Sequence, residues 1–269
     1  MSYTSTDETT FAALLRQAGP GGKPVTAAWY IIPSKSICAR WFNLLHWPYT
    51  LWHLSYVVIG AGLAEGLDWP VLCWTVLAFF LGMGIAAHCF DQLHGDPLRL
   101  GIKAGRLRFV GLTALAGAMA IGIWQIWAGQ VPTQLVFAVP IGASLAYGYG
   151  QEWKGFHGDW QFAAWWAVFP FLVGYLAQGL DFNPAVAALV IFAFMTALVQ
   201  RVLSTRVRYL RRQVGQATVT LETWHERQQE WLFGVMERKP WLLAPDEKAL
   251  AGLSAAMVLH AVSGLLFHV

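Results

Sequence analysis

The stretch VLCWTVLAFFLGMGIAAHCF, residues 71–90, is an almost continuous apolar run that reaches a histidine near its end. About 20 apolar residues are what an α-helix needs to cross the hydrocarbon core of a bilayer. The residues that follow, DQLHGDPLR at 91–99, are largely polar and include two aspartates. The stretch therefore predicts a transmembrane helix that carries a cluster of ionisable side chains to one membrane surface.

The whole chain has the composition of a membrane protein, because 57% of its 269 residues are hydrophobic and 12% are charged. Similar apolar runs predict an all-α integral membrane protein with about seven transmembrane helices, at 44–63, 71–90, 109–129, 134–150, 160–180, 184–203 and 249–268. The expected organisation is an N-terminal lead at 1–43, a six-span core at 44–203, a polar segment at 204–247 and a last span within 248–269.

The basic residues predict the orientation. With seven crossings, all 18 lysines and arginines fall in segments on the same side of the membrane as residues 1–43. Basic residues accumulate in cytoplasmic loops, so we expect a multi-pass protein of the cytoplasmic (inner) membrane with its N-terminus inside. The net charge of +3 describes that face, and no motif points to nucleic acid.

Residues 204–247 form the longest polar segment. Their apolar residues recur at steps of three and four from Leu203 to Val235, with a gap at Gln228, which predicts an amphipathic helix that ends before Pro240 and Pro245. Its apolar seam can dock on the protein's own cytoplasmic face, form a homodimer through residues 203–235, or lie on the membrane surface.

Two short loops gather ionisable groups where the second and fourth spans end, on the expected cytoplasmic side. The triplet His-Gly-Asp occurs in both, at 94–96 and at 157–159. Ionisable groups close to the hydrocarbon are costly and mark a site by default. The two loops contain His88, Asp91, His94 and Asp96, then Glu152, His157 and Asp159.

Carboxylates from two loops suit Mg²⁺, whereas histidines favour another divalent metal. We therefore predict a metal site at the active, cytoplasmic face, with His88, Asp91, Asp96, Glu152 and Asp159 as ligands. Asp91, Asp159, His157 and Glu152 are the predicted catalytic residues. In the alternative interpretations these groups cap helix ends and form ion pairs, or they relay protons.

His46 and His53 lie seven residues apart on the first span and share a helical face. They are candidates for a substrate pocket, although a histidine on an apolar helix is more often a hydrogen-bonded core residue. Trp165 belongs either to this pocket or to the tryptophans that border a membrane.

The sequences RWFNLLHWPYTLWHLSYVVIGAGLAEGLDW (40–69), FLGMGIAAHCFDQLHGDP (80–97) and IKAGRLRFVGL (102–112) carry a family resemblance. Together with SLAYGYGQEW (144–153), they resemble the UbiA-type intramembrane prenyltransferases over roughly residues 40–200. Phe90-Asp91 and Gly95 match part of the first aspartate-rich motif of that family, with His88 in place of its first aspartate. Tyr147 or Tyr149 stands at the position of the family's tyrosine.

The resemblance implies a UbiA-like helical bundle, an isoprenyl diphosphate substrate and Mg²⁺ as cofactor. It also implies metal-assisted ionisation followed by prenyl transfer or terpene cyclisation. The second aspartate-rich motif of the family is missing, because no acidic residue occurs between Arg201 and Leu221. Basic side chains are then the candidate diphosphate ligands: Arg99, Lys103, Arg106, Lys154, Arg201, Arg208 and Arg212.

Two functions follow. The first is an enzyme that acts on an isoprenoid at the cytoplasmic face. The second is a non-catalytic protein of the same fold that binds a lipid or a partner, with a structural polar cluster.

Overall fold

The structure is a computed structural model that describes residues 28–33, 36–94, 98, 100–150, 154–156, 158–214, 218–225, 230–237 and 239–269. The chain forms two compact units, which we describe separately. Residues 30–202 and 250–269 form the larger unit, and residues 203–249 belong to the smaller one with the N-terminal residues.

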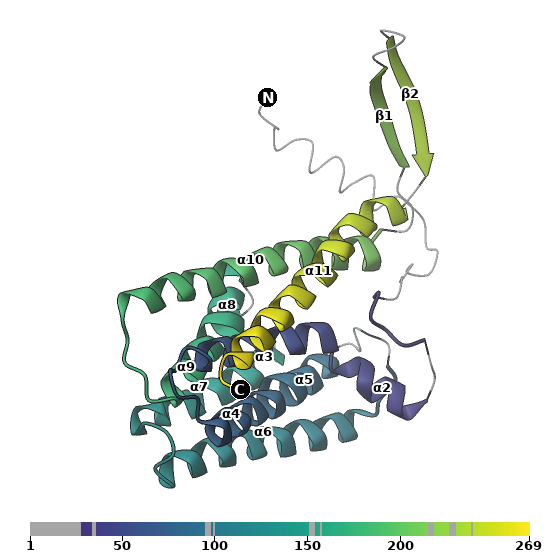
Figure 1. Ribbon diagram of the computed structural model, residues 1–269. Coiled ribbons are helices and arrows are strands. Elements are labelled where there is room, and N and C mark those ends of the chain that lie inside the picture. Colours follow the sequence, from purple (N-terminus) through teal and green to yellow (C-terminus); the bar gives the residue numbers. More distant parts are fainter. Residues whose placement is uncertain are drawn as a thin grey trace. The chain divides into compact units, whose positions relative to one another are not determined.

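The larger unit is a bundle of α-helices (Figure 1). Its elements are α2 (Ile37–Leu44), α3 (Trp47–Ala61), α4 (Trp69–Phe79), η1 (Phe80–Ala86), α5 (Ala87–Leu93), α6 (Ala104–Trp127), η2 (Thr133–Phe137), α7 (Ala138–Gly150), η3 (Lys154–Phe156), α8 (Asp159–Ala163), η4 (Ala164–Val168), α9 (Phe169–Ala177) and the adjoining parts of α10 (Pro184–Arg212) and α11 (Lys239–Leu266).

Helix α3 lies in the core of the bundle and packs against α9. The two backbones approach closely at two glycines. A Cβ atom on Gly60 would lie 2.1 Å from the carbonyl oxygen of Phe171, and one on Gly174 would lie 2.2 Å from that of Val57. Small residues are typical where transmembrane helices touch, so this crossing depends on both glycines.

Local sequence signals set several helix ends. The side chain of Asp68 caps α4 by accepting a hydrogen bond from the Val71 amide at 3.0 Å. Gly129 and Gly179 follow α6 and α9 with φ of 68° and 72°, the left-handed conformation in which glycine commonly ends helices.

Two of the long helices contain a π-helical turn. Element η1 joins α4 to α5, and η4 joins α8 to α9. A π-turn shifts carbonyl groups out of the regular α-helical hydrogen-bond pattern, and such turns occur frequently at functional sites.

Five of the described helices are long and apolar enough to cross a membrane: Trp69–Leu93, Ala104–Trp127, Asp159–Ala177, Pro184–Arg212 and Leu242–Leu266. They confirm a multi-pass helical membrane protein. The other two expected spans are helical but short, with 15 residues in α3 and 13 in α7. At 1.5 Å per residue, a 15-residue helix is about 22 Å long, less than the roughly 30 Å of hydrocarbon.

At each end of the bundle, polar contacts connect loops that seven crossings would place on the same side of the membrane. At one end, Arg40 donates to the carbonyl of Gly101 at 3.5 Å. At the other, the Asp68 amide donates to the Gln178 side chain at 2.8 Å, and a ring nitrogen of His268 lies 3.0 Å from the Gly62 carbonyl oxygen. Segments 62–68, 128–133 and 178–183 at this second end contain no lysine or arginine.

In the smaller unit, the expected amphipathic helix over 204–247 is wrong. Helix α10 ends at Arg212, strands β1 (Thr218–His225) and β2 (Glu230–Glu237) pair antiparallel, and α11 begins at Lys239. The 3-4 seam therefore does not form one helix over 203–235. The alternating polar and apolar or β-branched residues of TVTLETW, 218–224, explain the strand.

Ion pairs join α10 to α11 within this unit. Arg206 pairs with Asp246 at 3.2 Å, and Arg211 pairs with Glu247. Helix α11 contains Pro245, whereas the last span was expected to start after this proline.

Candidate functional site

A histidine from the turn between α2 and α3 and a histidine from α5 meet at the basic end of the bundle. The rings of His46, which precedes α3, and His88, on α5, stack with centroids 4.8 Å apart and planes 13° from parallel. The hydroxyl of Tyr30 lies 2.9 Å from Nδ1 of His46. His46 has a φ of 45°, an uncommon conformation for a non-glycine residue, and these two contacts hold it there.

His88 also links this pair to Asp91. Its Nδ1 donates to the carbonyl of Gly84 in the π-turn η1 at 2.7 Å. Asp91 lies on the same helix, α5, about one helical turn further along the chain than His88. The predicted shared face of His88 and Asp91 is therefore confirmed.

A glycine of α7 supports the backbone at Asp91. A Cβ atom on Gly150 would lie 2.2 Å from the Cβ atom of Phe90 and 3.0 Å from the amide nitrogen of Asp91. The end of α7 therefore packs closely against the backbone of α5 at Phe90 and Asp91.

The third histidine, His53, lies in the core and is 5% exposed. Its Nδ1 donates to the carbonyl of Trp166, 2.8 Å away in the second π-turn η4. A carbonyl can only accept, so Nδ1 carries the proton and Nε2 presents its lone pair. The buried Nε2 has no hydrogen-bond partner among the described residues.

Aromatic rings surround His53. The ring of Trp166 lies 5.3 Å from it and that of Phe79 lies 5.7 Å from it. Trp166 also contacts the ring of Tyr149 at 5.0 Å. The histidine thus has one hydrogen-bonded nitrogen and one acceptor nitrogen in apolar surroundings.

Asp159 forms an ion pair with Arg201, whose Nε lies 3.0 Å from the carboxylate. Arg201 also stands over the ring of Phe162 at 5.1 Å. Asp159 was predicted to bind a metal, and Arg201 was predicted to bind a diphosphate. In this arrangement the charge of each is balanced by the other.

The remaining predicted residues are dispersed or lie outside the described part. Lys103 and Arg106 are exposed near the start of α6. Arg208 donates to Thr205 at 3.1 Å and, with Arg212, belongs to the smaller unit. Tyr147 contacts the ring of Phe90 at 5.3 Å, and Trp165 packs in the core. Asp96, Arg99, Glu152, His157 and the side chain of Lys154 lie outside the described residues.

Among the residues that the structure describes, no group of three or more histidine, cysteine or acidic side chains could hold a metal ion. Asp91 and His88 are the described pair from the predicted ligand set, and Asp159 is engaged by Arg201. The described residues alone therefore do not make a complete Mg²⁺ site.

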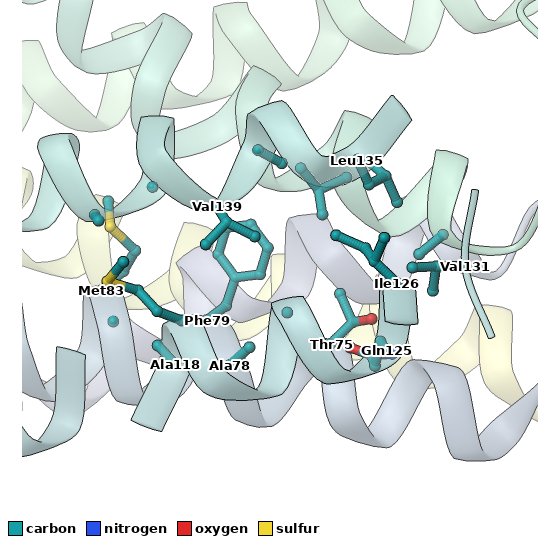
Figure 2. A pocket seen from close by; sticks show the side chains of 18 of the residues that line it. Thr75, Ala78, Phe79, Met83, Ala118, Gln125, Ile126, Val131, Leu135 and Val139 are labelled. Carbon is teal, nitrogen blue, oxygen red and sulfur yellow. The ribbon is translucent and has the colours of Figure 1, made fainter. Parts of the chain in front are cut away.

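A narrow apolar hollow of about 100 Å³ lies between α4–η1, α6, α7 and α9. Figure 2 shows Phe79 and Val139 within it, with Met83 toward one end and the polar side chains of Thr75 and Gln125 toward the other. The nine residues from Thr75 to Met83 span about 12 Å of helix. The lining residues of α6, α7 and α9 belong to the halves of these helices nearer the loops at 128–133 and 178–183. Met83 is the lining residue nearest to His88 along the chain.

Tyr30 and Trp166 contact the histidines but were not among the predicted site residues. Tyr30 lies before the first expected span, and Trp166 is the second residue of a tryptophan pair whose first member was the predicted one. The π-turn that exposes the Trp166 carbonyl has no recognisable sequence pattern.

The chain matches no protein-family model, no curated protein and no solved structure.

Proposed function

We propose that the protein is an intramembrane enzyme that acts on an isoprenyl diphosphate, by prenyl transfer or cyclisation. The observation that carries the proposal is that one continuous helix, Trp69–Leu93, contributes both to the apolar hollow, through Thr75 to Met83, and to the basic end, through His88 and Asp91. An isoprenyl diphosphate has the same division, with an apolar chain and a strongly charged head.

The walls of the hollow suit a branched hydrocarbon chain. They combine small residues on α4–η1, α6, α7 and α9 with Met83 and Met119, and methionine adapts its shape to irregular apolar ligands. The apolar walls exclude water, which would otherwise capture a carbocation formed from the chain.

The basic end of the bundle suits the diphosphate. Lys103 and Arg106 are exposed there, and Asp91 with His88 supplies an acidic and an imidazole group. A divalent cation would neutralise the diphosphate and favour its departure. Asp91 would bind this cation, and Lys103 and Arg106 would bind the phosphate oxygens.

The test is conversion of labelled geranyl, farnesyl and geranylgeranyl diphosphates by membranes that contain the protein, followed by analysis of the isoprenoid products. We expect release of diphosphate with the wild type and with His260→Gln, a change at an exposed position on α11. Asp91→Ala should lower the rate by at least about a hundredfold, as loss of an electrostatic contact in the transition state does. Equal rates with Asp91→Ala and the wild type would reject the proposal.

The ion pair between Arg201 and Asp159 favours the second function, a non-catalytic protein that binds an isoprenoid or another lipid in the hollow. In that case the polar groups stabilise the bundle, and the protein binds the labelled compounds without converting them. The same incubation separates the two functions, because only the enzyme yields new products.

A further inference from the structure

The acceptor nitrogen of His53 lies deep in the bundle and has no role in the proposed diphosphate site. Its side chain is 5% exposed, and its Nδ1 is committed to the carbonyl of Trp166 at 2.8 Å. No described residue donates a hydrogen bond to Nε2. A buried acceptor without a donor destabilises the protein, so a donor from outside the chain would be bound favourably here.

The surroundings restrict what that donor can belong to. The rings of Phe79 and Trp166 lie 5.7 Å and 5.3 Å from the His53 ring, and both are apolar on their faces. The group that reaches Nε2 must therefore carry one hydrogen-bond donor on an otherwise apolar molecule.

Phe79 connects this acceptor to the hollow. It contacts His53 and also lines the hollow, together with Phe169, whose ring lies 5.7 Å from that of Phe79. Phe79 therefore borders both the His53 ring and the hollow, whereas His53 itself does not line the hollow. A rotation of the Phe79 ring would let a hydroxyl at the end of an apolar chain in the hollow approach Nε2.

We propose that His53, between Phe79 and Trp166, is the polar anchor of a buried binding site for the hydroxyl group of a long-chain isoprenoid alcohol. The alcohol donates its O–H to Nε2 while its chain occupies the apolar hollow. The isoprenoid class rests on the proposed function, but the hydrogen bond to His53 does not. The site would hold an uncharged acceptor or product of the reaction.

Two matched compounds test the hydrogen bond. Geranylgeraniol has the donor, whereas its methyl ether has nearly the same chain without it. We expect the wild-type protein in detergent to bind the alcohol about five to ten times more tightly than the ether, the effect of one buried hydrogen bond. The preference should persist in His260→Phe and disappear in His53→Phe. Equal binding of the two compounds by the wild type would overturn the proposal.

A second measurement covers the case in which His53→Phe does not fold. In wild-type protein with ¹⁵N-labelled histidine, geranylgeraniol should shift one unprotonated imidazole nitrogen resonance and the ether should not. His53→Gln, which keeps an amide donor for the Trp166 carbonyl, assigns that resonance by its loss. No alcohol-specific shift at the assigned resonance means that the site does not exist.

The preference for the alcohol over its ether can be measured whether or not the protein converts prenyl diphosphates. If the protein converts prenyl diphosphates but does not prefer the alcohol, the His53 site is rejected and the proposed enzymatic function stands. If the protein prefers the alcohol but converts no diphosphate, the His53 site stands and the proposed enzymatic function is rejected.

Discussion

At the scale of single residues, His46, His53 and His88 are held by their neighbours in different ways. His88 and His53 each donate from Nδ1 to a carbonyl of a π-turn, whereas His46 stacks on His88 and is hydrogen-bonded to Tyr30. A donor on Nδ1 fixes the tautomer, so the backbone itself determines which nitrogen of His53 and His88 can accept a hydrogen bond.

The sequence predicts part of this arrangement. Residues three apart on a helix share a face, which places Asp91 beside His88. Spacing along one helix says nothing about rings from two helices, so the stacking of His46 on His88 could not be predicted. The pairing of Asp159 with Arg201 could not be predicted either, because 42 residues separate them in the chain.

The ion pair between Arg201 and Asp159 is tested by a double-mutant cycle. Arg201→Ala and Asp159→Asn should each lower the melting temperature in detergent. We expect a coupling energy of about 0.5 kcal/mol, since the Asp159 side chain is 55% exposed and solvent screens the interaction.

A matched cycle uses Asp181→Asn, which changes an exposed carboxylate at the opposite end of the bundle. Its effect should add to that of Arg201→Ala. If Asp159→Asn and Arg201→Ala are also additive, the two side chains do not interact in the folded protein.

At the scale of elements, apolar periodicity predicts most helices and misses two features. It gives the long helices because each contains an apolar run of membrane length. It does not give the π-turns, which arise from tertiary packing within otherwise ordinary helical sequence. It also assigned a helix to 218–237, where the 3-4 spacing of apolar residues coincides with the alternation that favours strands.

The crossing of α3 and α9 gives a prediction at this scale. Gly174→Ala should lower the melting temperature, with a loss of about 1–3 kcal/mol in the free energy of unfolding, because the new methyl group meets the Val57 carbonyl. The control is Gly252→Ala on α11, where a Cβ atom has no neighbour within 4 Å.

Gly252→Ala should leave the melting temperature unchanged or raise it, since alanine favours a helix more than glycine does. Equal melting temperatures for the two variants would show that α3 and α9 do not approach as closely as described.

At the scale of the whole molecule, charge is distributed asymmetrically along the bundle. Asp68 and Asp181 lie at the end whose loops contain no lysine or arginine, whereas Arg40, Lys103 and Arg106 lie at the other. Basic residues accumulate on the cytoplasmic side of membrane proteins, so the proposed function expects the basic end to face the cytoplasm. The same end contains His88 and Asp91, so a diphosphate would enter from the cytoplasm.

The central claim is that this end binds an isoprenyl diphosphate through Asp91, and binding of farnesyl diphosphate to the purified protein with Mg²⁺ tests it most directly. We predict that the wild type and Asp181→Ala, which alters the opposite end, bind with equal affinity. Asp91→Ala should bind at least about tenfold more weakly, a difference of about 1.4 kcal/mol. No binding to the wild type, or equal binding to all three proteins, would contradict the claim.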